Sequence, residues 1–223
     1  RRLRQMCIRD SVYALLLHKP HIIGFAEVFG LTNIERMRTL LVHKNYTFIY
    51  PSIGLNTGLA IAVHSEYNVI SSAFIPFTHA IFPDSLADKG FFIANVRHRT
   101  TQKSSIIITT HLQAKYPHWT DNAMRKKITN VQIQQLFQIF TYVTRFHPDI
   151  EYIICGDFNI NVHKKKRVAR IFAKLFPNAL LNRQSTTFDN EILDYIISSS
   201  SMQFVKSISV SYTHLTLPTK VSV

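Results

Sequence analysis

Polar residues suited to binding a metal ion or a phosphate group interrupt four apolar segments of the chain. Glu27 closes HIIGFAEV, His111 closes SSIIITTH, Asp157 and Asn159 follow the apolar run in EYIICGDFNIN, and Asp194 interrupts EILDYIISS. Strand interiors rarely contain Asp or Asn, so their place at strand ends suggests side chains directed into a cleft. An anionic oxygen beside an amide suits a divalent cation and a phosphate oxygen. These five residues are therefore the candidate site.

Each of these residues also has a simpler interpretation. Asp157 and Asn159 could form an Asx turn at the end of a strand, and GDFN alone would favour that interpretation. Glu27 could be a solvated strand end, His111 a hydrogen-bonded core histidine, and Asp194 the partner of a nearby Lys or Arg. Because the same pattern recurs at four strand ends, a single shared site is the better hypothesis. If strand geometry continues past residue 157, Asp157 and Asn159 alternate onto one face.

The elements that would position these residues form the pattern of a mixed α/β domain, in which apolar runs alternate with periodic segments. The longest helix is expected over residues 122–146, where apolar residues repeat at helical spacing. Further helices are expected over residues 33–44 and 164–176. Strands are expected over residues 21–28, 46–50, 59–63, 69–77, 91–97, 105–111, 151–155, 193–198 and 204–209.

The motifs AEV, THL, GDFN and LDY, in this order, resemble the endonuclease/exonuclease/phosphatase superfamily over residues 12–210. PDSLADKGFF (residues 83–92) and THLQAKY (residues 110–116) are similar to the neutral sphingomyelinases of that superfamily. The resemblance implies an α/β (α+β) class with a DNase I-like four-layer sandwich. Two packed mixed β-sheets would be flanked by helices, in a chain truncated at both ends.

The resemblance also implies a role for each candidate residue. Glu27 would be the principal ligand of a catalytic Mg²⁺, with Mn²⁺ or Co²⁺ as substitutes. Asp157 and Asn159 would contact the attacking water and the phosphate, His111 would stabilise developing charge, and Asp194 would orient a further His. The substrate-binding residues would be Asn159 again, Asp88 and Lys89 in the loop before Gly90, and Gln113 after the catalytic His. Lys89 would pair with the substrate phosphate or with Asp88.

The two ends of the chain are expected to be foreign to the protein. A DNA sequence encoding VSYTHLTLPT at residues 210–219 has a reverse complement that reads as RRQRQMCIRD, which matches residues 1–10 except at Leu3. We therefore interpret residues 1–11 and 210–223 as adaptor-derived and residues 12–209 as one incomplete domain. The family's first-strand Asn and its terminal Asp–His pair have no counterpart here. Because loss of a general base costs about 10²- to 10⁴-fold in rate, we expect this chain to be nearly inactive.

The charge, hydropathy and cysteine content of the chain restrict the class of partner that the domain could bind, but they do not identify one partner. The formal net charge is +13, and it falls to +9 when the five basic residues and one Asp of the two ends are set aside. That excess favours a polyanionic partner. No apolar window is long enough for a membrane span, so membrane contact would be peripheral. Cys155 is the only cysteine outside the two ends, which mildly favours a reducing compartment. Secreted and cytoplasmic locations both stay open, and the sequence does not indicate the oligomeric state.

The sequence is compatible with three functions. The first is hydrolysis of sphingomyelin to release phosphocholine at a membrane surface, with the aromatic residues 116–119 near the lipid. The second is a DNase I-like or AP-type endonuclease, for which the basic run at residues 164–170 would contact a nucleic-acid backbone, although such runs are more often a solvated helix face. The third is a scaffold that keeps the fold and binds lipid or protein without catalysis.

Overall fold

The structure is a computed structural model that describes residues 12–51, 56–116, 121–177, 179–180, 191–199, 211–212 and 215–216. The smaller sheet is antiparallel, with the strand order β1-β3-β2. It comprises β1 (Ile22–Phe25), β2 (Tyr46–Ile49) and β3 (Ala60–His64), and α2 (Leu31–Val42) packs on its outer face. Residues 12–16 are also helical, and Val12 and Leu15 join that packing.

The larger sheet has the strand order β4-β5-β6-β7-β9-β8. Strands β6 and β7 pair in parallel, whereas the other described neighbours in this sheet pair antiparallel. The strands are β4 (Tyr67–Pro76), β5 (Gly90–His98), β6 (Ser104–His111), β7 (Glu151–Asp157), β8 (Ala179–Leu180) and β9 (Asp194–Ser198). Helices α3 (Asn122–Phe146) and α4 (Lys166–Leu175) cover its outer face, and a short 3-10 helix, η1 (Asp84–Leu86), precedes β5.

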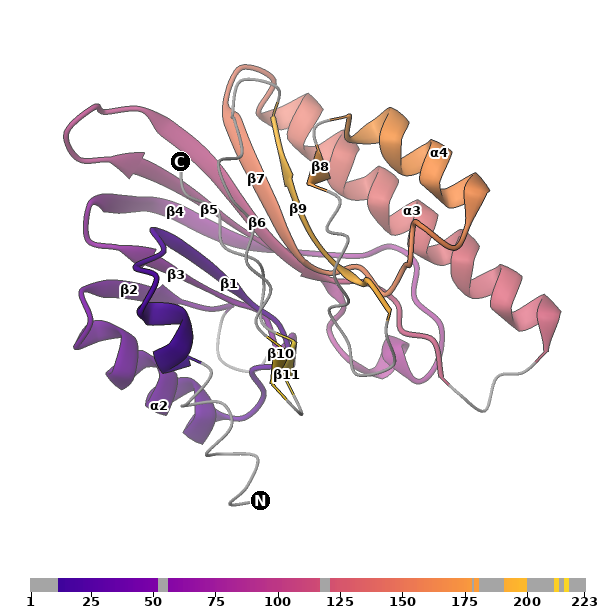
Figure 1. The fold of residues 1–223 in the computed structure, drawn as a ribbon, viewed down its shortest axis with the longest axis horizontal. Helices are drawn as coiled ribbons and strands as arrows, with labels where there is room; N and C mark the ends of the chain where they lie inside the picture. Colours follow the sequence, from indigo (N-terminus) through magenta and orange to yellow (C-terminus); the bar gives the residue numbers. More distant parts are fainter. Residues whose placement is uncertain are drawn as a thin grey trace.

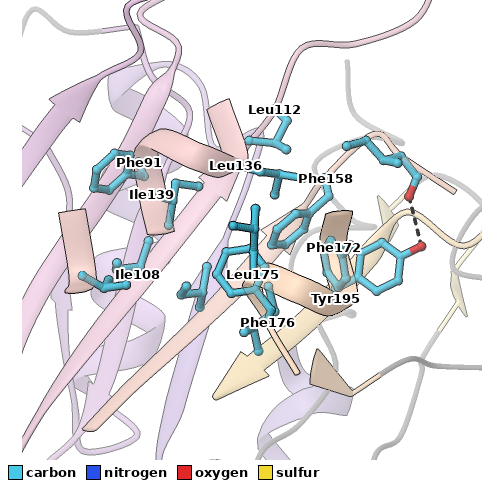
Figure 2. Packing of buried hydrophobic residues seen from close by; sticks show 14 of the residues in the cluster. Phe91, Ile108, Leu112, Leu136, Ile139, Phe158, Phe172, Leu175, Phe176 and Tyr195 are labelled. Atoms are coloured by element: carbon cyan, nitrogen blue, oxygen red, sulfur yellow. Dashed lines mark hydrogen bonds between the residues drawn. The ribbon is translucent and has the colours of Figure 1, made fainter. Parts of the chain in front are cut away.

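The elements stack in four layers, which confirms the DNase I-like sandwich expected from the sequence (Figure 1). Three apolar cores lie between successive layers. Strand alternation divides the side chains among them: in β3, Ala60 and Ala62 face α2 while Ile61 and Val63 face the larger sheet. Figure 2 shows the outer core, where Phe158, Phe172 and Tyr195 pack beneath the helices. The strand ends are thereby held by packing on both sides of the larger sheet.

Most element boundaries fall within two or three residues of those expected, and α3 begins and ends where predicted. The expected strand over residues 204–209 and the aromatic residues 117–119 lie outside the described part of the chain. Within the expected adaptor-derived end, residues 211–212 (β10, Ser211–Tyr212) pair with residues 215–216 (β11, Leu215–Thr216). In the described residues, no helix has both the length and the apolar character needed to cross a bilayer.

Candidate active site

Three of the predicted residues lie side by side because of the register of three neighbouring strands. The parallel pair β6 and β7 ends with His111 opposite Asp157, and β9 begins with Asp194 opposite the same Asp157. The carboxyl ends of the parallel strands therefore meet the amino end of β9 at one edge of the sheet. His111 and Asp194 are both buried.

Glu27 reaches the same region from the smaller sheet. It follows β1, which contacts β6 and β7, and its backbone has a positive φ of 62°. The turn is fixed by a 2.8 Å hydrogen bond from Val28 N to Gly58 O. Gly58 also has a positive φ, 67°, and a Cβ there would come within 2.6 Å of the Phe29 ring. The Glu27 carboxylate is close enough to raise the pKa of Asp157, so the two sheets together complete the site.

Asp157 and Asn159 come together through a turn. Strand β7 ends at Asp157, and Asn159 has a φ of 51°, so strand alternation does not place the two side chains on one face as expected. Instead, Asn159 N donates to Asp157 Oδ1 at 2.7 Å, which is an Asx turn. Asn159 Nδ2 donates to Leu112 O at 3.0 Å. Because a carbonyl only accepts, the atom that faces Leu112 is Nδ2. Asn159 Oδ1, an acceptor, is left for a cation or a water molecule, and the second Nδ2 hydrogen is left for a phosphate oxygen.

Burial moves the pKa values of Asp157 and His111 toward their neutral forms. Burial, together with the charge of Glu27, raises the pKa of Asp157 to about 6, although the Asn159 N–H, Lys89 and Lys115 act against the rise. Burial, with Lys89 adding to it, lowers the pKa of His111 to about 3. His111 Nε2 lies 3.8 Å from Asp157 Oδ2. Because the imidazole is neutral at physiological pH, this contact is not an ion pair.

Lys89 points into the same region, but its partner differs from the one expected. Its Nζ lies 3.6 Å from Asp84 Oδ2 and 3.5 Å from Leu112 O, and both charged side chains are nearly buried. Asp88 instead accepts a hydrogen bond from Asn56 N. The expectation that Lys89 pairs with Asp88 was therefore wrong, because η1 turns Asp84 inward. Burial lowers the pKa of Lys89, and the charges of Asp84, Asp157 and Glu27 oppose that shift.

Gln113 makes contacts that do not suit the substrate-binding role expected for it. The residue is fully buried, and its Oε1 accepts a hydrogen bond from Ile81 N at 2.7 Å. Its backbone N–H donates to Gln135 Oε1 at 2.9 Å, and its carbonyl accepts from Gln132 Nε2 at 2.7 Å. Because these bonds connect Gln113 to the protein interior, it acts on the site through the loops it holds.

Comparisons with known proteins now bear on the fold. SmcL superposes with a TM-score of 0.70 at 18% identity, over 91% of this chain and 79% of that protein. Sphingomyelinase C from Streptomyces griseocarneus gives 0.65 at 14% identity, covering 91% and 83%. TDP2 from D. rerio, complexed with a single-strand DNA product, gives 0.62 at 15% identity, covering 91% and 80%. The chain has a DNase I-like fold. It is the fold of the endonuclease/exonuclease/phosphatase superfamily, to which these structures belong.

Sequence comparison adds nothing to this result, since no family model and no curated protein matches the chain. Among the structural neighbours, beta toxin from Staphylococcus aureus has been solved with bound magnesium ions, at a TM-score of 0.64 and 16% identity, covering 90% of this chain and 82% of that protein. At this level of identity the DNase I-like fold is what the neighbours share with this chain.

The residues of this candidate site fit a hard divalent cation. In the described part of the chain, no group of three or more His, Cys, Asp or Glu side chains is arranged to hold a metal. Mg²⁺, however, uses one or two carboxylates and completes its coordination with water and substrate oxygens. Glu27 is exposed, and its charge contributes to the raised pKa of Asp157. A cation near both carboxylates would offset that repulsion.

Sequence reasoning missed four residues at or beside this site. Asp84 accepts hydrogen bonds from Ala114 N and from the Tyr116 hydroxyl, each at 2.6 Å, and forms an ion pair with Lys89. Gln132 and Gln135 are fully buried on α3. Lys115 lies close enough to lower the pKa of Asp157. The two glutamines could have been found, because they fall on the apolar face of α3, where an uncharged polar side chain needs a specific partner.

Proposed function

We propose that this chain is a Mg²⁺-dependent phosphodiester hydrolase whose substrate is sphingomyelin, from which it releases phosphocholine at a membrane surface. The observation that carries the proposal is the convergence of Glu27, His111, Asp157, Asn159 and Asp194 from four strand ends on one edge of the larger sheet. Titratable groups with shifted pKa values, gathered in one place as His111 and Asp157 are, are typical of catalytic sites rather than of packing.

The proposed chemistry assigns each side chain a task that its surroundings favour. Asp157, with a pKa raised to about 6, is ionised at neutral pH and orients a water molecule for attack on phosphorus. His111 is neutral and donates an N–H hydrogen bond to a phosphoryl or leaving oxygen. Lys89 contributes a positive charge from the interior. A bound Mg²⁺ would offset the charge of the phosphodiester and lower the pKa of bound water. Asn159 Oδ1 would be available to that ligand shell, and the second hydrogen of its Nδ2 to a phosphate oxygen.

The choice of sphingomyelin is supported by two observations. The segments PDSLADKGFF and THLQAKY, which are similar to neutral sphingomyelinases, supply Asp84, Lys89, His111 and Gln113 around the site. Sphingomyelinase C is among the structural neighbours of this chain.

A second candidate, a nuclease, is favoured by a cluster of cations beside Asp157. Lys115 follows β6, Lys164 and Lys165 follow β7, and Arg125 lies in the first turn of α3. Neighbouring positive charges in this cluster contribute to lowering the pKa of Lys115 and Lys165, although burial is the larger cause. Glu191 forms an ion pair with Lys164, and the remaining positive charge would attract a nucleic-acid backbone. TDP2 with its DNA product is the corresponding structural neighbour.

The experiment compares the hydrolysis of several substrates and measures metal affinity separately from turnover. The full chain with Mg²⁺ is incubated with sphingomyelin vesicles, lysophospholipid and supercoiled DNA, while Mn²⁺ affinity is measured by electron paramagnetic resonance. Because we expect slow turnover from this chain, metal binding is the primary measurement. Glu27→Gln should weaken Mn²⁺ binding by at least about tenfold. Glu35→Gln, which changes an exposed glutamate of α2, is the matched control.

The outcomes separate the three hypotheses. Phosphocholine release that requires Glu27 supports the proposal, and nicking of DNA without lipid hydrolysis supports the nuclease. If the wild type, Glu27→Gln and Glu35→Gln bind Mn²⁺ with equal affinity, Glu27 is not a metal ligand. That result would overturn both enzymatic functions, and the non-catalytic scaffold would be the remaining hypothesis.

A further inference from the structure

Three buried glutamines lie between α3 and the loops of the site. Gln113, Gln132 and Gln135 have no exposed surface, and the last two lie among the apolar residues that α3 packs against the sheet. Burying an amide is unfavourable unless its polar atoms form hydrogen bonds, and apolar side chains would fill the same space without that cost. The three side chains therefore need an explanation other than packing.

Their hydrogen bonds connect three separate loops. Gln132 Nε2 donates to Asn159 O at 2.9 Å, after β7, and to Gln113 O at 2.7 Å, after β6. Gln135 accepts from Gln113 N at 2.9 Å and donates to His79 O at 2.8 Å. Gln113 Oε1 accepts from Ile81 N at 2.7 Å, in the loop that leads to η1. One continuous set of bonds thus holds the loops that carry Asn159, the residues after His111, and Asp84.

The bond to Asn159 is the one with the most direct consequence for the site. Asn159 has a φ of 51°, in the left-handed region, which asparagine adopts more readily than most residues but which only glycine adopts freely. Such a conformation persists only where the surroundings fix it. Asn159 N, Nδ2 and O are all engaged, with Asp157, Leu112 and Gln132 respectively. Gln132 is the only one of these three partners that belongs to a helix, so it ties the strained residue to a rigid element.

We propose that Gln132 is a positioning residue for the phosphate-binding side of the site. The hydrogen bonds of its amide group keep Asn159 and the loop after His111 at a fixed separation. The hydrogen bonds of Gln135 and Gln113 connect both to the loop before η1. The proposal rests on the proposed function in one respect, since Asn159 meets a phosphate only if the chain binds a phosphodiester. The hydrogen bond from Gln132 to the Asn159 backbone does not depend on which substrate the chain binds.

The test replaces the amide while keeping its size. Gln132→Met removes the two donated hydrogen bonds, and Gln138→Met is the matched control. Gln138 lies on the same helix and also bonds backbone groups, Pro76 O and Thr78 N, but neither belongs to the two segments whose exchange is measured below. Two properties are measured on the full chain: amide hydrogen exchange in residues 112–116 and 157–161, and affinity for inorganic phosphate with saturating Mn²⁺. Thermal midpoints show whether each variant folds.

We expect Gln132→Met to speed exchange in both segments and to weaken phosphate binding by roughly tenfold, whereas Gln138→Met leaves both properties unchanged. Asn159→Gly provides a further check. Glycine adopts a positive φ without strain, so Gln132→Met should speed exchange of residues 157–161 less in that background. If Gln132→Met does not fold, Gln132→Leu, which also removes both donated bonds and introduces no charge, is compared in the same way.

The proposal is overturned if Gln132→Met exchanges at the wild-type rate in both segments, or if Gln138→Met has the same effects. Phosphate affinity within twofold of the wild type would also overturn it. If the wild type itself binds no phosphate, the proposed function fails. In that case amide hydrogen exchange is the only test of the role of Gln132. Faster exchange of Gln132→Met in the two segments alone supports that role, and unchanged exchange overturns it.

Discussion

His111 and Asp157 lie opposite each other at the end of the parallel pair β6 and β7, yet the protein does not stabilise them as an ion pair. Burial lowers the pKa of the imidazole and raises that of the carboxyl. Each group is therefore moved toward the form without charge. Because the charge of Glu27 also raises the pKa of Asp157, a cation near both carboxylates would lower the free energy of the site, which agrees with the proposed metal dependence.

The raised pKa of Asp157 predicts that this residue destabilises the metal-free protein at neutral and alkaline pH. Its folded pKa, about 6, exceeds the ordinary value of 3.8. Stability is therefore full below about pH 4 and is lost as the pH rises through 6. Asp157→Asn keeps the acceptor of the Asx turn and should raise the free energy of unfolding at pH 8 by about 1–2 kcal/mol, allowing for partial solvent exposure.

Urea denaturation without metal, at pH 4 and pH 8, measures this effect. The gain should vanish at pH 4, and saturating Mg²⁺ should remove it at pH 8. An equal gain at both pH values would show that the cause is packing and that ionisation of Asp157 is irrelevant.

His111 should make the protein sensitive to acid. Its folded pKa, about 3, lies below the ordinary value of 6.5, so its contribution to stability is full above pH 6.5 and is lost as the pH falls toward 3. His111→Gln should flatten the pH dependence of the unfolding free energy between pH 6 and pH 4, measured by urea denaturation. His43→Gln, an exposed histidine after α2, should leave the wild-type slope. Parallel slopes for wild type and His111→Gln would contradict the expectation.

Among the elements, the loop between β4 and β5 brings an ion pair to the site. Within it, η1 places Asp84 against Lys89, Ala114 N and the Tyr116 hydroxyl. Because Lys89 and Asp84 are both nearly buried, loss of one charge leaves the other without compensation. Asp84→Asn should therefore destabilise the protein by about 3–5 kcal/mol, measured by chemical denaturation.

Asp88→Asn is the matched control for that substitution. Its carboxylate bonds only Asn56 N among the contacts of the described residues, so we expect a loss of about 1 kcal/mol or less. The pair Asp84→Asn and Lys89→Met should be less unstable than the sum of the single variants, because no unpaired charge remains. Additive losses would show that the Lys89–Asp84 contact does not stabilise the fold.

The elements themselves could be predicted well because strand and helix periodicity is local. Residues 122–146 carry an apolar stripe that fixes α3, and the strand ends at His111 and Asp157 were found from their polar interruptions. The partner of Lys89 could not be found in this way. Asp88 is adjacent in sequence, but the choice between Asp84 and Asp88 depends on η1, a single turn without a periodic signal. The positive φ of Asn159 is likewise set by contacts with α3 and Leu112.

At the scale of the whole molecule, the two sheets approach each other closely at Gly24. A Cβ there would lie 2.3 Å from Cys155 Sγ and 3.2 Å from Thr109 Oγ1. Gly24→Ala should therefore destabilise the protein by about 1–3 kcal/mol through overpacking. Replacing Cys155 by Ala as well should restore part of the loss, as measured by urea denaturation. A double variant that is less stable than Gly24→Ala by the full cost of Cys155→Ala would contradict this view of the interface.

The sequence predicted a four-layer sandwich but could not supply the register that completes the site. The order of the motifs carried the resemblance to the superfamily, and the resemblance implied the sandwich. Alternation in β3 and β5 explains why separate cores lie on the two faces of each sheet. The meeting of Asp157 with both His111 and Asp194, however, depends on pairing between strands far apart in the chain. Single-sequence patterns carry no information about such pairing.

Strand β9 joins the larger sheet between β7 and β8, and its first residue, Asp194, completes the row that begins with His111. A ribosome translates position 27 well before position 194, so during synthesis the acidic residue of the first sheet emerges without its distant counterparts. Any hydrolytic capacity of this chain is consequently acquired late in translation, when β9 has left the exit tunnel and docked.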